Sequence, residues 1–313
     1  MRADAALVLA AMLGGTIVPL SAHAYCRTTT CCRTAPCTDS EVCVIDPKTQ
    51  CATNGAALAW GERCVTLWLP NTPTPLPGID AATLTRVTDD AFAHWPDVVC
   101  PAGRPTIDVR LGGAIDCALT GFDQDAMQNV NTLQVVSENW PHPDPLGQLA
   151  LTTVRSLVST GEILDTDIEL NAANFHFTAS DEVVLTDLES TLTHEAGHAL
   201  GLDHTTDPEA TMNGVWSPLK RTSLRTLEAD DVAGICAIYP AGLAASNACV
   251  LAATVDDPAS VCRAVVTPRT THSSSCGVAQ PAANGLRLWV WNALAIVSAC
   301  WSRRRRRARA YSS

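Results

Sequence analysis

The chain has 313 residues, 14 cysteines and a formal net charge of −11 at pH 7. Six arginines lie in the last eleven residues, so the remainder of the chain is more acidic than this total. An acidic body repels phosphate, which argues against a nucleic-acid partner. Cysteines in this number are typical of proteins that form disulfides in an oxidising compartment.

The N-terminus has the pattern of a cleavable signal peptide over residues 1–24. Arg2 precedes an apolar run, and the small residues "AHA" stand directly before Tyr25. We therefore expect an exported protein. Because Tyr25 rather than a cysteine follows the small residues, we do not expect an N-terminal lipoprotein.

A cysteine-rich segment follows over residues 25–63. Cysteines crowd this segment and the start of the next one: Cys26, Cys31, Cys32, Cys37, Cys43, Cys51 and Cys64. Further along, Cys100 could pair with Cys117, and Cys249 with Cys262. Cys236 would then pair with the odd member of the N-terminal set. Connectivity cannot be read from spacing alone, so these pairings are hypotheses.

Residues 64–240 are long enough for one domain with its own hydrophobic core. The segment "CVTLWLP" (64–70) predicts an opening strand. Residues 77–98 predict a helix, because their apolar residues recur at helical spacing: Leu84, Val87, Ala91, Phe92 and Trp95. Residues 106–112 and 131–138 alternate between apolar and polar side chains, which predicts two further strands.

A second helix is predicted to contain the stretch "LTHEAGHALGLDH" (192–204). Thr186, Asp187 and Glu189 form a capping-box pattern, which indicates that the helix begins there. Gly201 can adopt the left-handed conformation that ends helices at almost no steric cost. We therefore expect the chain to turn back after Gly201.

This stretch carries a candidate metal centre. His194 and His198 are one helical turn apart on one face, and His204 can return to them once the helix has ended. Three imidazoles without a fourth protein ligand are typical of catalytic zinc, with water in the open position at a pKa of about 7. Glu195 is placed to act as general base and then as acid toward the leaving amine. Two histidines at this spacing are often ordinary residues, but Glu195, Gly201 and His204 together argue against that.

These residues resemble the HExxHxxGxxH signature of the metzincin zinc peptidases. Met212 stands eight residues after His204, where metzincins have their Met-turn. Residues 224–240, "LRTLEADDVAGICAIYP", resemble the closing helix of the matrixin branch, with an apolar stripe that we expect to pack in the core. The resemblance covers residues 64–240 and is strongest over residues 187–240.

The resemblance implies an α+β, zincin-like fold: a twisted mixed sheet with about three helices and an active-site cleft under the edge strand. It also implies a zinc-dependent endopeptidase acting on protein or peptide substrates, with His194, His198 and His204 as zinc ligands and Glu195 as the catalytic base. Residues 147–154 resemble the matrixin edge strand, which holds substrate by main-chain hydrogen bonds. In residues 213–221, Val215 and Trp216 suggest an apolar substrate pocket.

Further metal sites are weaker predictions. Matrixins often bind a second zinc through a histidine of the edge strand, but Leu151 stands at that position. His142, Asp144 and His176 could build such a site, although isolated histidines are usually not ligands. Calcium could bind the acidic residues before and after the edge strand, but their loop spacing is incomplete. We expect these acids to be solvated: Asp123, Asp125, Asp165, Asp167 and Glu169.

Three alternatives remain open at this point. An N-terminal cysteine thiolate could occupy the open zinc position, as in the matrixin cysteine switch, but no PRCGxPD-like segment occurs and the even cysteine count favours full pairing. The chain could be a non-catalytic surface binding or adhesion module on the same scaffold, which the intact Glu195 argues against. It could also be a zinc hydrolase of another amide.

The C-terminal part changes composition twice. Residues 241–285 have a linker composition, and residues 286–313 place a short apolar stretch before the arginine cluster. That stretch is too short to cross a bilayer alone. Together with Cys276 it resembles bacterial sorting tails of the MYXO-CTERM type, which implies processing near Cys276 and attachment to the outer cell surface. A retained membrane helix with its arginines inside is the alternative.

Overall fold

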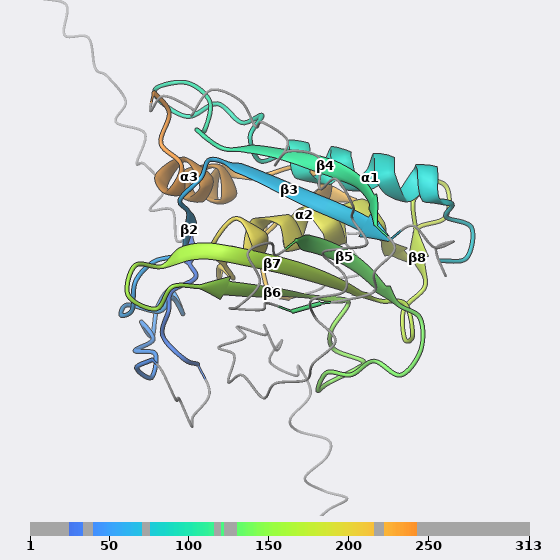
Figure 1. Ribbon diagram of the computed structural model, residues 1–313, viewed down its shortest axis with the longest axis horizontal. Helices are drawn as coiled ribbons and strands as arrows, with labels where there is room; N and C mark the ends of the chain where they lie inside the picture. The colour runs from blue at the N-terminus through green and yellow to red at the C-terminus, as the bar shows by residue number, and fades with distance from the viewer. Residues whose placement is uncertain are drawn as a thin grey trace, which may run out of the picture.

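The computed structural model describes residues 25–33, 40–70, 76–115, 120–121, 130–215 and 222–242. Its centre is a twisted sheet with the strand order β2-β7-β5-β3-β4, and an additional strand, β6, pairs with β7 (Figure 1). The strands are β2 (Ala59–Trp60), β3 (Cys64–Pro70), β4 (Asp108–Ile115), β5 (Asn131–Val136), β6 (Ala150–Ser156) and β7 (Glu162–Asn171). All neighbours are parallel except β6, which is antiparallel to β7.

Three α-helices are found in the described part of the chain: α1 (Ala81–Ala93), α2 (Leu188–Ala199) and α3 (Ala229–Ile238). A short 3₁₀ helix, η2 (Ser223–Arg225), precedes α3. The helices lie behind the sheet in the view of Figure 1. The main core is formed between the sheet and these helices, with Trp95, Leu133, Ile168 and Leu192 all fully buried. The predicted fold class, a mixed sheet with about three helices, is confirmed.

The predicted elements occur close to their expected bounds. The strand predicted at 64–70 is β3, and the strands predicted at 106–112 and 131–138 are β4 and β5. The helix predicted within 77–98 is α1, which begins after Asp80 because that side chain accepts a hydrogen bond from Thr83 N at 2.7 Å. The predicted edge strand is β6, which pairs only with β7 among the described strands.

Two small sheets tie distant segments to α2. β8 (Phe177–Thr178) pairs with β9 (Thr186–Asp187), which leads directly into α2. β1 (Cys26–Arg27) pairs antiparallel with β10 (Leu202–Asp203), which follows α2. The start of the cysteine-rich segment is therefore part of the folded domain that contains the histidines.

The hypothesis for the disulfide of Cys100 is wrong. Cys100 is bonded to Cys236, across a sequence separation of 136 residues, so Cys117 is not its partner and Cys236 does not pair with the N-terminal set. The reason is tertiary, because the segment after α1 packs beside α3. The other disulfides between described residues are Cys26–Cys51 and Cys31–Cys43. Every described cysteine is disulfide-bonded, so the thiolate switch finds no free thiol in the part of the chain that the structure describes.

The expectation of solvated acids is also wrong for β7. Asp165, Asp167 and Glu169 have exposed fractions of 1%, 2% and 8%. They alternate with the core residues of β7 and therefore lie on the sheet face opposite the helices. Strands within a largely parallel sheet are commonly covered on both faces, and this burial could not be read from an acidic, alternating sequence.

Several predictions fall outside the described residues. These are the signal peptide (1–24), the linker and sorting tail (241–285 beyond Gly242, and 286–313), the pair Cys249 and Cys262, the acids Asp123 and Asp125, and Trp216. Within the described ranges, no helix has the length and hydropathy needed to cross a membrane.

Candidate metal centre

The three predicted histidines converge on one point. His194 and His198 extend from α2, and His204 comes from the loop after β10. The Nε2 atom of His194 lies 3.0 Å from Nε2 of His204 and 3.2 Å from Nε2 of His198. Separations of this size suit nitrogens that share one zinc ion at about 2.0–2.1 Å.

Hydrogen bonds on the far side of two rings set their protonation. Nδ1 of His194 lies 2.6 Å from the carbonyl oxygen of Thr211, and Nδ1 of His198 lies 2.9 Å from that of Leu202. A carbonyl can only accept, so Nδ1 carries the proton and Nε2 keeps its lone pair. Burial and the neighbouring rings lower the pKa of His194 to about 3, and the same causes lower the pKa of His204. His194 and His204 are therefore neutral, as a metal requires.

The helix that carries the first two histidines begins one residue later than the capping-box pattern indicates. The N-cap is Asp187, whose carboxylate accepts from Ser190 N at 2.8 Å, whereas Thr186 belongs to β9. Arg225 donates to both carboxylate oxygens of Asp187, at 2.9 and 2.5 Å. Glu189 does not complete the box but pairs with His94 at 3.3 Å.

α2 ends just before Gly201, as predicted, and the structure gives a second reason for a glycine at this position. Gly201 has φ of +97°, which reverses the chain toward His204. A Cβ at Gly201 would also lie 2.7 Å from the carbonyl oxygen of Leu58, because the N-terminal segment crosses this turn. The carbonyls at the end of the helix accept hydrogen bonds from distant donors: Trp60 Nε1 to Ala199 O, Tyr239 OH to Leu200 O and Thr28 N to Gly201 O.

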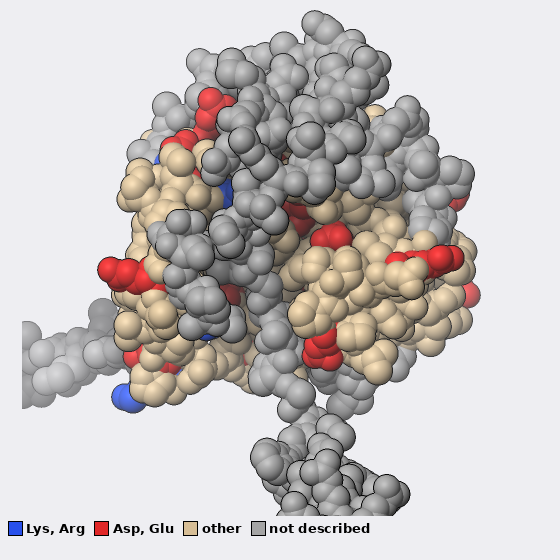
Figure 2. All heavy atoms as spheres, turned by 60° about the horizontal axis from the view of Figure 1, so that its bottom comes forward, with Lys and Arg blue, Asp and Glu red and all other residues tan. Residues whose placement is uncertain are grey.

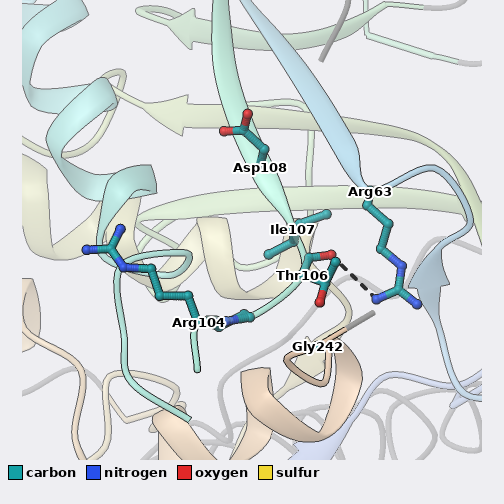
Figure 3. A pocket seen from close by; sticks show the side chains of 7 residues that line it. Arg63, Arg104, Thr106, Ile107, Asp108 and Gly242 are labelled. Carbon is teal, nitrogen blue, oxygen red and sulfur yellow. Dashed lines mark hydrogen bonds between the residues drawn. The ribbon is translucent and has the colours of Figure 1, made fainter. Parts of the chain in front are cut away.

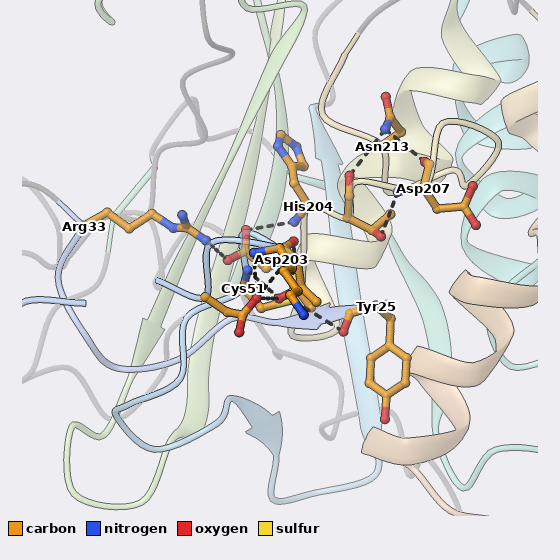
Figure 4. The surroundings of a disulfide bond; sticks show 12 residues. Tyr25, Arg33, Cys51, Asp203, His204, Asp207 and Asn213 are labelled. Carbon is orange, nitrogen blue, oxygen red and sulfur yellow. Dashed lines mark hydrogen bonds and ion pairs between the residues drawn. A yellow bond between two sulfur atoms is a disulfide. The ribbon is translucent and has the colours of Figure 1, made fainter. Parts of the chain in front are cut away.

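The cysteine-rich segment also contacts the residue before the third histidine (Figure 4). Arg33 forms an ion pair with Asp203, whose side chain is only 8% exposed. The other oxygen of Asp203 accepts a hydrogen bond from His204 N at 2.8 Å. Sequence reasoning missed this contact, because nothing in the spacing relates Arg33 to Asp203.

Met212 lies in a buried turn under α2. Its thioether packs so closely on the helix that a Cβ at Gly197, between the two helical histidines, would lie 2.3 Å from the sulfur. The turn is held from α3, because the Asp231 carboxylate accepts from Thr211 N at 2.8 Å and Met212 N at 2.9 Å. The closing helix thus supports the histidines through Asp231, a role that its apolar stripe does not indicate.

Glu195 is buried, at 7% exposed, on the side of α2 that faces β6. One of its carboxylate oxygens, Oε2, accepts a hydrogen bond from Thr152 Oγ1 at 2.5 Å. Burial raises the pKa of the Glu195 carboxyl, and His198 and Thr152 oppose that rise. The Glu195 side chain lies beside the histidines, but its oxygens do not belong to the group of converging ligand atoms.

The donor set fits a divalent ion. The ligand atoms of His194, His198 and His204 all lie within 4.8 Å of one another, and they form the only such group of three among the described residues. The lone pairs on Nε2 of His194 and His198 face each other and repel unless a cation or a proton lies between them. Neutral imidazoles are ligands that zinc prefers.

The other predicted ligands do not gather into a second group in the described part of the chain. His142 instead pairs with Glu169 at 2.8 Å, and His176 and Asp144 lie outside any cluster. Two pockets lined by described residues lie away from the histidines. A pocket of about 240 Å³ lies between Arg63, Arg104 and Gly242 (Figure 3). A second, of about 330 Å³, lies along β5. Neither of these two pockets is lined by the histidines, and it is the donor geometry that identifies the site.

Comparison with known families agrees with this geometry. Residues 136–240 match the family model of the matrixins, peptidase family M10. This match and the histidine triad support a matrixin-like metzincin. The matched residues run from the end of β5 to Pro240 and include the three histidines, Glu195 and Met212. The matrixin-like match also supports a metallopeptidase that depends on zinc. The comparison with curated proteins gives no match.

Proposed function

We propose that this protein is an exported zinc-dependent endopeptidase of the matrixin type. The observation that carries the proposal is the convergence of three imidazoles beside a buried carboxylate. His194, His198 and His204 direct Nε2 to one point, and Glu195 stands next to them on α2. The matrixin match over residues 136–240 supports the same activity.

Each residue of the site has a distinct role in this proposal. A bound zinc ion would supply Lewis acidity, which lowers the pKa of water and polarises a carbonyl group. The three histidines would hold the ion, and the carbonyls of Thr211 and Leu202 would keep two of their rings in the required tautomer. Glu195 would accept a proton from the attacking water and deliver it to the amine of the departing peptide.

The substrate would be a protein or peptide bound in an extended form. β6 pairs with β7 on one side and has no second strand partner among the described residues, and an edge of this kind can bind a further strand through its backbone groups. A peptide that adds to this edge would lie along the strand whose Thr152 contacts Glu195. In the face shown in Figure 2, acidic side chains outnumber basic ones on the described surface, which disfavours a nucleic-acid substrate.

The proposal includes export and surface attachment. Export is supported by the structure, whereas attachment is supported only by the sequence. The disulfides of the described residues support an extracellular location, because such bonds persist in oxidising compartments. Attachment through the C-terminal tail rests on the sequence pattern alone, as does the cleavage of the signal peptide.

The proposal is tested on the secreted, oxidised protein by metal analysis and a peptide-library digest with and without a chelator. We expect bound zinc, cleavage that the chelator abolishes, and recovery when zinc is returned. Glu195→Gln should retain zinc but lower kcat/KM by about 10²- to 10⁴-fold, the usual contribution of a general base. The control is Glu182→Gln, which removes an exposed carboxylate ahead of α2 and should leave cleavage unchanged.

The outcomes separate the alternatives. Undiminished cleavage by Glu195→Gln would contradict the role of the glutamate. Zinc binding without cleavage of any peptide would favour a non-catalytic binding module, and turnover of small amides alone would favour another class of zinc hydrolase. Failure to retain zinc would remove the basis of the proposal.

A further inference from the structure

Thr152 is buried in β6 and faces α2. Its exposed fraction is 4%, and its strand partner is Ile168, a core residue on the helix side of the sheet. The next residue, Thr153, pairs with Asp167 and lies on the opposite face. Two threonines in succession therefore point to different sides of one strand, and only Thr152 reaches the metal centre.

The Thr152 hydroxyl makes a short, specific contact with the Glu195 side chain. Oγ1 donates to Oε2 of Glu195 at 2.5 Å, and it also lies 3.3 Å from the backbone carbonyl oxygen of the same residue. Oε1 accepts no hydrogen bond from the described residues. One oxygen of the carboxylate is thus anchored to the sheet, and the other is left free for a reacting group.

Both partners are held firmly. A β-branched side chain in a strand has few accessible χ1 rotamers, so the Thr152 hydroxyl is fixed relative to β6. β6 is joined to β7 by a seven-residue register, and α2 contacts β6 directly. The hydrogen bond therefore fixes the Glu195 carboxylate relative to β6. A long glutamate side chain without this anchor would occupy several rotamers.

We propose that Thr152 is a positioning residue for Glu195: its hydroxyl fixes Oε2, so that Oε1 is presented to the water and then to the leaving amine. The inference rests on the proposed peptidase function and deepens it. Because the same strand offers its free edge to the substrate, Thr152 would set the distance between the bound peptide and the base. A misplacement of about 1 Å in such a constellation can cost about 10²-fold in rate.

The test compares Thr152→Val and Thr152→Ser with the wild-type protein. Valine keeps the β-branched shape and removes the hydroxyl, whereas serine keeps the hydroxyl. We expect Thr152→Val to lower kcat by about ten- to a hundredfold with less than a twofold change in KM, and Thr152→Ser to restore most of the loss. Zinc content should be unchanged in both. Thr85→Val, the same substitution at an exposed position of α1, is the control and should keep full activity.

Crystal structures of the zinc-loaded wild type and Thr152→Val provide a readout that does not depend on turnover. We expect one Glu195 rotamer in the wild type and several in the valine variant. Thr152→Ala serves the same purpose if the valine variant does not fold. The inference is wrong if Glu195 keeps one position without the hydroxyl, or if Thr152→Val retains the wild-type kcat while Glu195→Gln is inactive. If the wild type cleaves nothing, the proposed function fails, and the rotamers still decide the positioning role.

Discussion

Two buried aspartates on β7 carry unequal sets of partners. Asp167 accepts hydrogen bonds from Thr132 N, from Thr132 Oγ1 and from Gly121 N, at 3.0, 2.7 and 2.6 Å. Asp165 is equally buried, but its Oδ1 atom has no hydrogen-bond partner among the described residues. Burial and the charge of Asp167 raise the pKa of Asp165 to about 8, although Arg155 opposes the rise, and burial raises the pKa of Asp167 to about 6.

These raised pKa values predict that ionisation of Asp165 and Asp167 lowers the free energy of unfolding as the pH rises. The folded state binds the proton of Asp165 more tightly than the unfolded chain does, so its contribution to stability is complete at low pH and is lost as the pH rises through about 8. We expect the free energy of unfolding of the wild type to fall by roughly 1–3 kcal/mol more than that of Asp165→Asn between pH 5 and pH 9. Urea unfolding at several pH values measures this difference.

Asp90→Asn is the control, because Asp90 is a half-exposed surface acid paired with Arg86. Its pH profile should run parallel to that of the wild type. A wild-type stability that instead rises with pH and falls on addition of a chelator, with no such response in Asp165→Asn, would mean that a cation neutralises these acids, and the prediction would then be wrong.

At the scale of elements, the end of α2 is held by segments from both ends of the domain. β1 pairs with β10, Trp60 and Tyr239 donate to the last helical carbonyls, and Arg33 pairs with Asp203. Each contact lies within a few residues of a histidine. The cysteine-rich segment therefore acts as a support of the metal centre.

This arrangement predicts that Arg33→Ala weakens zinc binding. Without Arg33, one oxygen of the buried Asp203 loses its partner, and the backbone that presents His204 is less firmly held. We expect zinc affinity to fall by about tenfold, as is usual when a group behind a metal ligand is removed. Competition with a zinc chelator measures the affinity.

Arg110→Ala is the matched control, since Arg110 pairs with Asp108 and both side chains are about half exposed. It should leave zinc affinity unchanged, because exposed pairs contribute little and this one lies on β4. An Arg33→Ala protein with wild-type affinity would show that β1 and its disulfide hold the loop without the ion pair.

At the scale of the whole molecule, Cys100–Cys236 joins the segment after α1 to α3. α3 carries Asp231, which holds the turn of Met212 under the histidines. The bond closes a loop with a sequence separation of 136, much longer than that of 12 closed by Cys31–Cys43. Long loops gain most from closure, because more conformations of the unfolded chain are removed.

We therefore predict that the double variant Cys100→Ser, Cys236→Ser loses more stability than Cys31→Ser, Cys43→Ser. The expected loss for the first is about 2–5 kcal/mol, measured by urea unfolding of the oxidised proteins. Equal losses in the two double variants would argue that local packing, and not loop closure, determines what each bond contributes.

The sequence by itself determined the elements whose signals are local. The spacing of His194 and His198, the glycine at 201 and the return of His204 define the metal centre, because helical geometry fixes what residues four apart can do. The bounds of β3 and the place of α1 followed from apolar periodicity in the same way. These signals need no knowledge of distant residues.

Only the tertiary structure decided which distant residues support that centre. Thr152 meets Glu195 across 43 residues, and Arg33 meets Asp203 across 170. The partner of Cys100 and the burial of Asp165 were wrongly anticipated for the same reason. Such contacts depend on how strands pair and which faces are covered, and those choices arise when the whole chain packs, so no local spacing encodes them.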